Sequence, residues 1–141
     1  MVEAAGRLSR GSRAILALSL AGGLLIGGVA SAHTAIVPTS LSLKASPSKN
    51  VPKHTAVKFS GVLSSNDPAC KGLSRVNVFR VNDGFVGRTQ TRVNGQWSLT
   101  KNVIKTATYQ AVFDGKILSA VHPHSHTCAA SASNTVTVTV K

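Results

Sequence analysis

The feature that most constrains this chain is a two-residue alternation of apolar and polar side chains, which recurs in short runs. Leu41, Leu43 and Ala45 alternate with polar residues, and the same spacing returns over residues 57–63 and 134–141. Alternating side chains lie on opposite faces of a β-strand, one facing the core and the other facing water. After residue 32, no stretch shows the spacing of an amphipathic helix. We therefore predict an all-β fold.

Turn-forming residues separate these runs at intervals of about ten residues. Ser64–Gly72 contains Asp-Pro and Lys-Gly and is predicted to be a loop. Asn94-Gly95 predicts a hairpin turn of type I′, in which both central residues adopt positive φ. About seven short strands at this spacing favour an antiparallel β-sandwich over a fold with crossover helices. The predicted core residues include Phe59, Trp97, Tyr109 and Val138.

One of these runs does not keep a single phase. Val76 and Val78 share one face, whereas Phe79 and Val81 occupy the opposite phase. Two explanations stay open from the sequence: both faces of this strand are covered, or a β-bulge shifts the register.

The first 32 residues have the organisation of a secretory signal peptide. Three arginines precede the uncharged segment Ala14–Val29, and Ala30-Ser31-Ala32 offers the small residues that a signal peptidase accepts. The alternative is an uncleaved membrane anchor, but the glycines and the small-residue site favour cleavage. We expect residues 1–32 to be a signal peptide and His33 to be the new N-terminus. Residues 33–141 would then form one domain without a membrane span, secreted or associated with the cell wall.

Two cysteines, Cys70 and Cys128, follow this segment. Exported proteins fold in an oxidising compartment, where an even number of cysteines favours disulfide bonds. The alternative is metal ligation, for which the chain lacks a C-x-x-C pair, although histidines precede Cys128. We therefore expect a Cys70–Cys128 disulfide.

Taken together, the strands and turns resemble the small immunoglobulin-like domains of secreted actinobacterial proteins. The resemblance is carried, in chain order, by Val57–Leu63, Asp67–Cys70, Val76–Arg80, Thr91–Leu99, Thr108–Phe113 and Cys128–Val140. It implies an immunoglobulin-like β-sandwich over residues 33–141, with a disulfide that tethers a loop. It also implies that the hydroxyl of Tyr109 ties its strand to upstream backbone, as in a tyrosine corner. Such a fold implies binding or scaffolding without identifying the ligand.

Basic residues greatly outnumber acidic ones in this chain, with 16 Lys and Arg against 4 Asp and Glu. This excess attracts anionic partners, although basic side chains also serve solubility and discourage strand pairing at sheet edges. Lys58, Arg88 and Arg92 occupy outward positions of the predicted strands. We expect them to contact an anionic cell-envelope polymer or an extracellular protein or glycan. Nucleic acid is not an expected partner, because export removes the chain from it and no exposed aromatics alternate with the charges.

The composition argues against an enzyme. The carboxylates after residue 32 are Asp67, Asp83 and Asp114, and each lies in a turn sequence, where Asp accepts local backbone hydrogen bonds. Each such turn also has too few carboxylates for a calcium site. Motifs of nucleophilic, phosphate-binding and zinc-dependent enzymes are absent from the sequence. We predict a non-catalytic protein without a cofactor; an extracellular hydrolase whose triad residues are distant in sequence is the third candidate.

His122, His124 and His126 alternate in a segment that we predict to be an irregular loop. In an extended segment, alternate residues point to one side and can share a transition metal. An N-terminal His33 would add an α-amine and an imidazole, which resembles half of the histidine brace of periplasmic copper carriers and lytic polysaccharide monooxygenases. The alternative function is therefore a periplasmic or extracellular copper-binding carrier. The competing interpretation is that these histidines are solvated surface residues.

Overall fold

The computed structural model describes residues 33–119 and 124–141. Most of these residues lie in β-strands, and the helix among them is the four-residue α2 (Pro68–Lys71). The prediction of an all-β fold is confirmed at this level. The predicted signal peptide, residues 1–32, and His122 lie outside the described residues. Within 33–119 and 124–141, no helix is long and apolar enough to span a bilayer.

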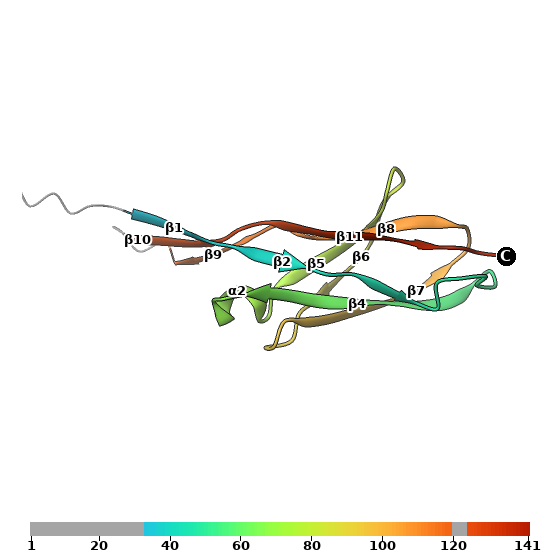
Figure 1. The fold of residues 1–141 in the computed structure, drawn as a ribbon, viewed down its shortest axis with the longest axis horizontal. Coiled ribbons are helices and arrows are strands. Elements are labelled where there is room, and N and C mark those ends of the chain that lie inside the picture. Colours follow the sequence, from blue (N-terminus) through green and yellow to red (C-terminus); the bar gives the residue numbers. More distant parts are fainter. Residues whose placement is uncertain (1–32, 120–123) are drawn as a thin grey trace, which may run out of the picture. The chain divides into compact units, whose positions relative to one another are not determined.

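Two larger sheets and one smaller sheet make up the fold (Figure 1). The first larger sheet has the order β11-β8-β5-β6 and is antiparallel; its strands are β5 (Arg75–Arg80), β6 (Gly84–Gln90), β8 (Ala107–Phe113) and β11 (Ser131–Val138). In the second, β4 pairs antiparallel with three strands; its members are β2 (Thr39–Leu41), β3 (Lys44–Ser46), β4 (Thr55–Ser65) and β7 (Gln96–Val103). The smaller sheet has the order β1-β10-β9 and consists of β1 (His33–Val37), β9 (Lys116–Ser119) and β10 (His124–Cys128).

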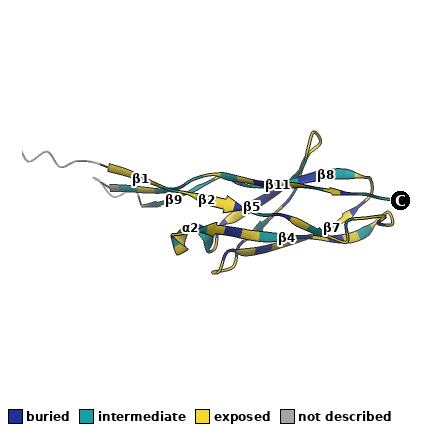
Figure 2. Cartoon of the chain, viewed as in Figure 1, coloured by how far each residue is buried: buried dark blue, intermediate teal, exposed yellow. Residues whose placement is uncertain are grey.

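The buried faces of the two larger sheets share one core. Phe59 of β4 packs against Tyr109 of β8, with 4.6 Å between ring centroids. Figure 2 shows buried and exposed positions alternating along β4, as the sequence pattern predicts. The predicted core residues Phe59, Trp97, Tyr109 and Val138 are all buried. Burial also raises the pKa of the Tyr109 phenol above 10.0.

The hydroxyl of Tyr109 does not make the backbone tie that the tyrosine-corner resemblance implies. Among the hydrogen bonds of the described residues, none involves this hydroxyl, whereas the ring packs on Phe59. The residue therefore contributes to the core through its ring.

The out-of-phase run at Val76–Val81 is explained by cover on both faces of β5. The pairing of β5 with β6 shifts register between Val78 and Phe79. The extra residue of this bulge lies on β6, because Val78 pairs with Gly87 and Phe79 with Phe85, whereas β5 pairs with β8 without a shift. Of the two explanations that the sequence left open, the structure supports cover on both faces of β5, since Asn77 is buried on one face and Val76 and Val78 on the other. Phe79 lies on the face of Asn77 and packs against Phe85.

The turn predicted at Asn94-Gly95 exists, but it differs from the prediction in its type and in the pairing of the strands that it connects. Gly95 has φ +86°, whereas Asn94 is not among the residues with positive φ, so the turn is not of type I′. The amide of Gly95 donates a hydrogen bond to the carbonyl of Arg92. Gly95 itself adopts the left-handed backbone conformation. The strands on either side pair elsewhere, β6 with β5 and β7 with β4, so the turn carries the chain from one sheet to the other.

The histidine segment is also different from the predicted irregular loop, because His124–Cys128 forms strand β10. It pairs in parallel with β1, from His33 opposite His124 to Val37 opposite Cys128. Its side chains are mostly polar, so apolar alternation could not reveal the strand. One of its two pairing partners, β9, lies close in sequence, but the other, β1, lies at the start of the described residues, so that pairing is beyond any local pattern.

The predicted disulfide is confirmed: Cys70 in α2 is bonded to Cys128 in β10, with 5.6 Å between the Cα atoms. Both residues are buried. The helix lies inside the predicted loop, and Asp67 caps its N-terminus by accepting a hydrogen bond of 2.9 Å from the amide of Ala69. Asp followed by Pro is a helix-start signal as well as a turn signal, which is why the sequence alone did not separate the two.

Candidate anion-binding groove

A groove of about 330 Å³ lies on the sheet formed by β3, β4 and β7. Three basic residues line it: Lys44 from β3, Lys58 from β4 and Arg92 from the turn before β7. Among the described residues, no Asp or Glu lines the groove. We call this site, with its three cations, the cationic groove.

Strand register explains why these side chains meet. Lys44, Ser60 and Ser98 are successive partners across β3, β4 and β7. Lys58 precedes Ser60 by two residues on the same strand, so both occupy the outward phase, while Phe59 between them points into the core. The outward phase therefore gathers two ammonium groups and two hydroxyls on one face of this sheet.

The turn that precedes β7 brings the third cation. The amide of Arg92 donates a hydrogen bond of 2.8 Å to the carbonyl of Gln96, and Gln96 is the partner of Val62 on β4. The backbone of Arg92 is thereby fixed beside the groove, while its side chain is exposed. Its guanidinium offers up to five donors, which suits carboxylate, sulfate or phosphate oxygens.

The floor of the groove contains Trp97 and Gly61, which are direct partners on β7 and β4. Among the described residues, the buried indole Nε1 of Trp97 has no hydrogen-bond partner. A Cβ at position 61 would lie 3.0 Å from this nitrogen and would overlap the carbonyl oxygen of Ser42. Glycine at position 61 thus allows the β2–β3 segment to approach closely, and the single tryptophan of the chain lies beside the cations.

Asp83 compensates basic residues in another part of the surface. Its carboxylate lies 3.0 Å from Nη1 of Arg80 and 2.8 Å from Nζ of Lys105. The hydrogen bond from Lys105, followed by the positive charges of Arg80 and Lys105, holds the pKa of Asp83 below its ordinary value of 3.8. The ion pairs between side chains in the described part of the chain are these two, Arg80–Asp83 and Lys105–Asp83. Neither of them includes a cation of the groove.

The structure separates Arg88 from the other two predicted contact residues, Lys58 and Arg92, which line the groove together. Arg88 lies on β6, where its Nε donates a hydrogen bond of 2.8 Å to Oδ1 of Asn77. The amide nitrogen of Asn77 in turn donates to Asp114. The guanidinium also lies 5.9 Å from the ring centroid of Phe85. Arg88 therefore belongs to a different surface.

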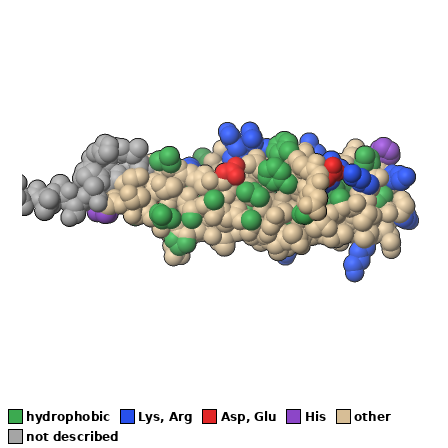
Figure 3. Space-filling model, turned by 90° about the horizontal axis from the view of Figure 1, so that it is seen from above, with side chains coloured by type: hydrophobic (Ala, Val, Ile, Leu, Met, Phe, Trp, Pro, Cys, Tyr) green, Lys and Arg blue, Asp and Glu red, His purple; other side chains and the backbone are tan. Residues whose placement is uncertain are grey.

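Sequence reasoning missed Lys44 and the role of Trp97 in the groove. Lys44 occupies an outward position of the alternating run that begins at Leu41, so the sequence pattern indicated that its side chain faces away from the core. The sequence did not indicate the direct pairing of Lys44 with Ser60, because that pairing depends on strand register. Lys and Arg side chains also lie on the face shown in Figure 3, so charge alone does not single out the groove.

Of the predicted metal ligands, His33, His124 and His126 lie on the smaller sheet, whereas His122 lies outside the described residues. His33 is the direct partner of His124, and His126 is the partner of Ala35, so backbone alternation puts all three histidine positions on one face of the β1–β10 pair. In the part of the chain that the structure describes, no group of three His, Cys, Asp or Glu side chains could hold a metal ion.

Comparison with known proteins adds no relative: no protein-family model matches the chain, and no curated protein shows a significant match. The functional interpretation therefore depends on the residues themselves.

Proposed function

We propose that the chain is exported and that residues 33–141 form an immunoglobulin-like, non-catalytic module that binds an anionic cell-envelope polymer or an extracellular anionic protein or glycan. The observation that carries this proposal is the cationic groove, in which Lys44, Lys58 and Arg92 line one depression without a carboxylate. The antiparallel sheets and the disulfide are in keeping with such a module.

The groove suits a repeating anion because its cations come from three elements and lie beside hydroxyl groups. Each exposed ion pair contributes up to about 1 kcal/mol, so one charge on the ligand gives weak binding and several give useful affinity. Salt would weaken the interaction, because exposed charges are screened over about 10 Å at 0.1 M ionic strength.

Trp97 allows the proposal to be tested directly, since it is the only tryptophan and lines the groove. We expect its fluorescence to change saturably on titration with alginate or dextran sulfate and to stay constant with neutral dextran. Replacing both Lys58 and Arg92 by alanine is expected to weaken polyanion binding about tenfold, the loss of about 1.4 kcal/mol.

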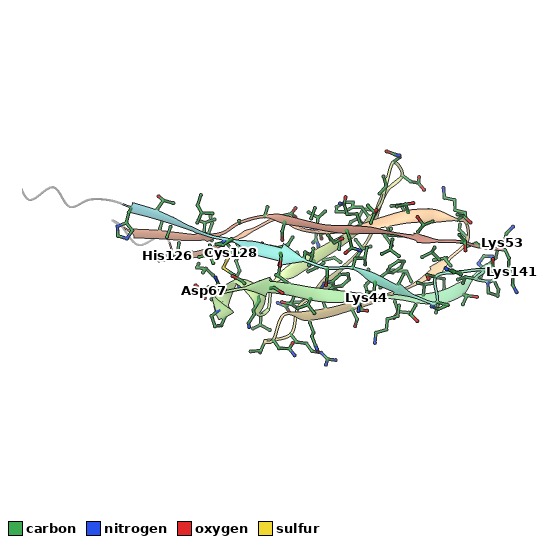
Figure 4. All side chains as sticks on the ribbon, in the orientation of Figure 1. Lys44, Lys53, Asp67, His126, Cys128 and Lys141 are labelled. Atoms are coloured by element: carbon green, nitrogen blue, oxygen red, sulfur yellow. A yellow bond between two sulfur atoms is a disulfide. The ribbon has the colours of Figure 1, made fainter. Side chains whose placement is uncertain are left out.

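The matched control removes two charges elsewhere. Lys53 and Lys141 lie together at one end of the described part, away from Lys44 (Figure 4), and the double change Lys53→Ala/Lys141→Ala should leave the affinity within about twofold. If both double variants lose affinity equally, binding depends on net charge and the groove is not the site.

A second candidate function is copper carriage, and the direct pairing of His33 with His124 on parallel strands favours it. Imidazole is a good ligand for Cu(II), and two neighbouring ligands can chelate one ion. Calorimetric titration with Cu(II) should then give one site tighter than about 1 μM. His33→Ala should abolish this site, whereas His54→Ala, a change of an exposed histidine after β3, should leave it intact. Equal weak binding by all three proteins would exclude the carrier function.

A further inference from the structure

Three large hydrophobic side chains that the core does not use lie exposed around the β5–β6 turn. Val81, Phe85 and Ile104 have exposed fractions of 41%, 54% and 53%. Phe85 and Ile104 line one cavity of about 210 Å³, and Val81 lines the adjacent depression together with Lys105, which borders both. We call these three residues the Phe85 patch. None of them lines the cationic groove.

Basic side chains surround the Phe85 patch. Arg80, Lys101 and Lys105 line the same cavity as Phe85. Arg88 lies over the Phe85 ring, at 5.9 Å from its centroid. The carboxylate at this site is Asp83, which pairs with Arg80 and Lys105 and leaves an excess of positive charge. Hydrophobic side chains beside Lys and Arg side chains are also visible on the face shown in Figure 3.

Exposed hydrophobic residues with a basic rim are suited to an anionic bilayer surface. Apolar side chains enter the boundary between headgroups and acyl chains, while Lys and Arg are attracted to anionic headgroups. Exposed apolar patches with a polar rim commonly mark interaction sites. The arrangement here supplies both components within one small region of the surface.

The surroundings of the Phe85 ring argue against a saccharide at this patch. A sugar would stack on an open ring face, but the Arg88 guanidinium lies over the Phe85 ring. Phe79 packs against Phe85 in an edge-on arrangement, with 5.7 Å between ring centroids. Phe85 nevertheless remains exposed and lines the same cavity as aliphatic Ile104, so an apolar surface is available for insertion into lipid.

We propose that the Phe85 patch docks the protein onto membranes that contain anionic lipids, with Phe85 and Ile104 entering the bilayer interface and the surrounding Arg and Lys side chains contacting headgroups. This inference goes beyond the proposed function, because it assigns a second surface and a different class of partner. It does not depend on the cationic groove.

The test compares sedimentation with phosphatidylcholine vesicles that contain, or lack, phosphatidylglycerol. Each variant is expressed as the full chain and purified in the form that the cell exports. The masses of the purified variants should differ from that of wild type only by the substitution. Wild type should bind the anionic vesicles. Phe85→Ser and Ile104→Ser should each weaken this binding about tenfold, because an apolar contribution is lost while all charges stay in place. Two variants are used because Phe85 also contacts Phe79.

The matched control is Ile117→Ser, which removes an equally apolar side chain, 71% exposed, from β9. It should bind anionic vesicles as wild type does. The proposal is overturned if wild type does not bind the anionic vesicles. It is overturned as well if Phe85→Ser and Ile104→Ser bind them as wild type does, because charge attraction alone would then account for the binding. It is also overturned if these variants lose binding to alginate and wild type binds no vesicles, which would assign the patch to a polysaccharide.

The outcome is separable from that of the groove experiment. Lys58→Ala/Arg92→Ala changes no residue of the Phe85 patch and should retain vesicle binding within about threefold, the effect expected from two remote charges. Loss of alginate binding with retained vesicle binding would support both proposals, whereas the reverse would contradict both.

Discussion

Replacing Cys70 and Cys128 together by alanine should lower the free energy of unfolding by about 4 kcal/mol. The bond closes a sequence separation of 58 residues, and its loss enlarges the conformational freedom of the unfolded chain. A domain of this size has a net stability of roughly 5–15 kcal/mol, so the loss is a large share of the total. Both sulfur atoms are in buried residues, and the bond joins α2 to β10.

Urea unfolding followed by Trp97 fluorescence measures this change. Wild-type protein with reductant serves as the control, because it loses the same bond without any substitution and should lose a similar free energy. A difference below about 1 kcal/mol between oxidised and reduced wild type would contradict the prediction, and would mean that the reduced unfolded chain is already compact.

The second large effect is expected from Phe59→Ala, which should cost about 3–5 kcal/mol. Phe59 is fully buried and contacts Tyr109, so its ring joins β4 of one sheet to β8 of the other. Truncation removes apolar burial and leaves a cavity that the surrounding strands cannot fill completely.

Val62→Ala provides the comparison for Phe59→Ala on the same strand. Val62 faces outward from β4 and is 38% exposed, so its truncation should cost less than about 1 kcal/mol. Equal losses for the two variants in urea unfolding would contradict the arrangement of a shared core between the two larger sheets.

Local patterns were sufficient to predict part of the fold. Alternation of side chains identified β4, β8 and β11 and their inward residues, because burial of one face leaves a period of two in the sequence. The two cysteines indicated the disulfide through their even number and the expected compartment. The broken phase after Val78 indicated cover on both faces of β5 as one of two explanations.

Non-local pairing accounts for what the sequence could not predict. The turn at Asn94-Gly95 was visible, but the sheets that it connects were not, because β7 pairs with the distant strand β4 and not with β6, which pairs with the preceding strand β5. Lys58 and Arg92 were both predicted as contact residues, yet only the register and the turn place them at one groove. Arg88 looked equivalent in sequence, and its bond to Asn77 distinguishes it.

The pairing of β1 with β10 has a consequence for how the chain reaches its native state. Thr39 donates a hydrogen bond to the carbonyl of Ala129, across a sequence separation of 90 residues, and β1 itself pairs with residues 124–128. As a polypeptide emerges in order from a ribosome or a translocation channel, β1 has no pairing partner until nearly all of the chain has appeared, whereas β2 and β3 can pair with β4 earlier. High contact order of this kind slows folding and prolongs the time for which unpaired strand edges are open to aggregation. Chaperone protection of the nascent chain would therefore matter most before its last 20 or so residues are released.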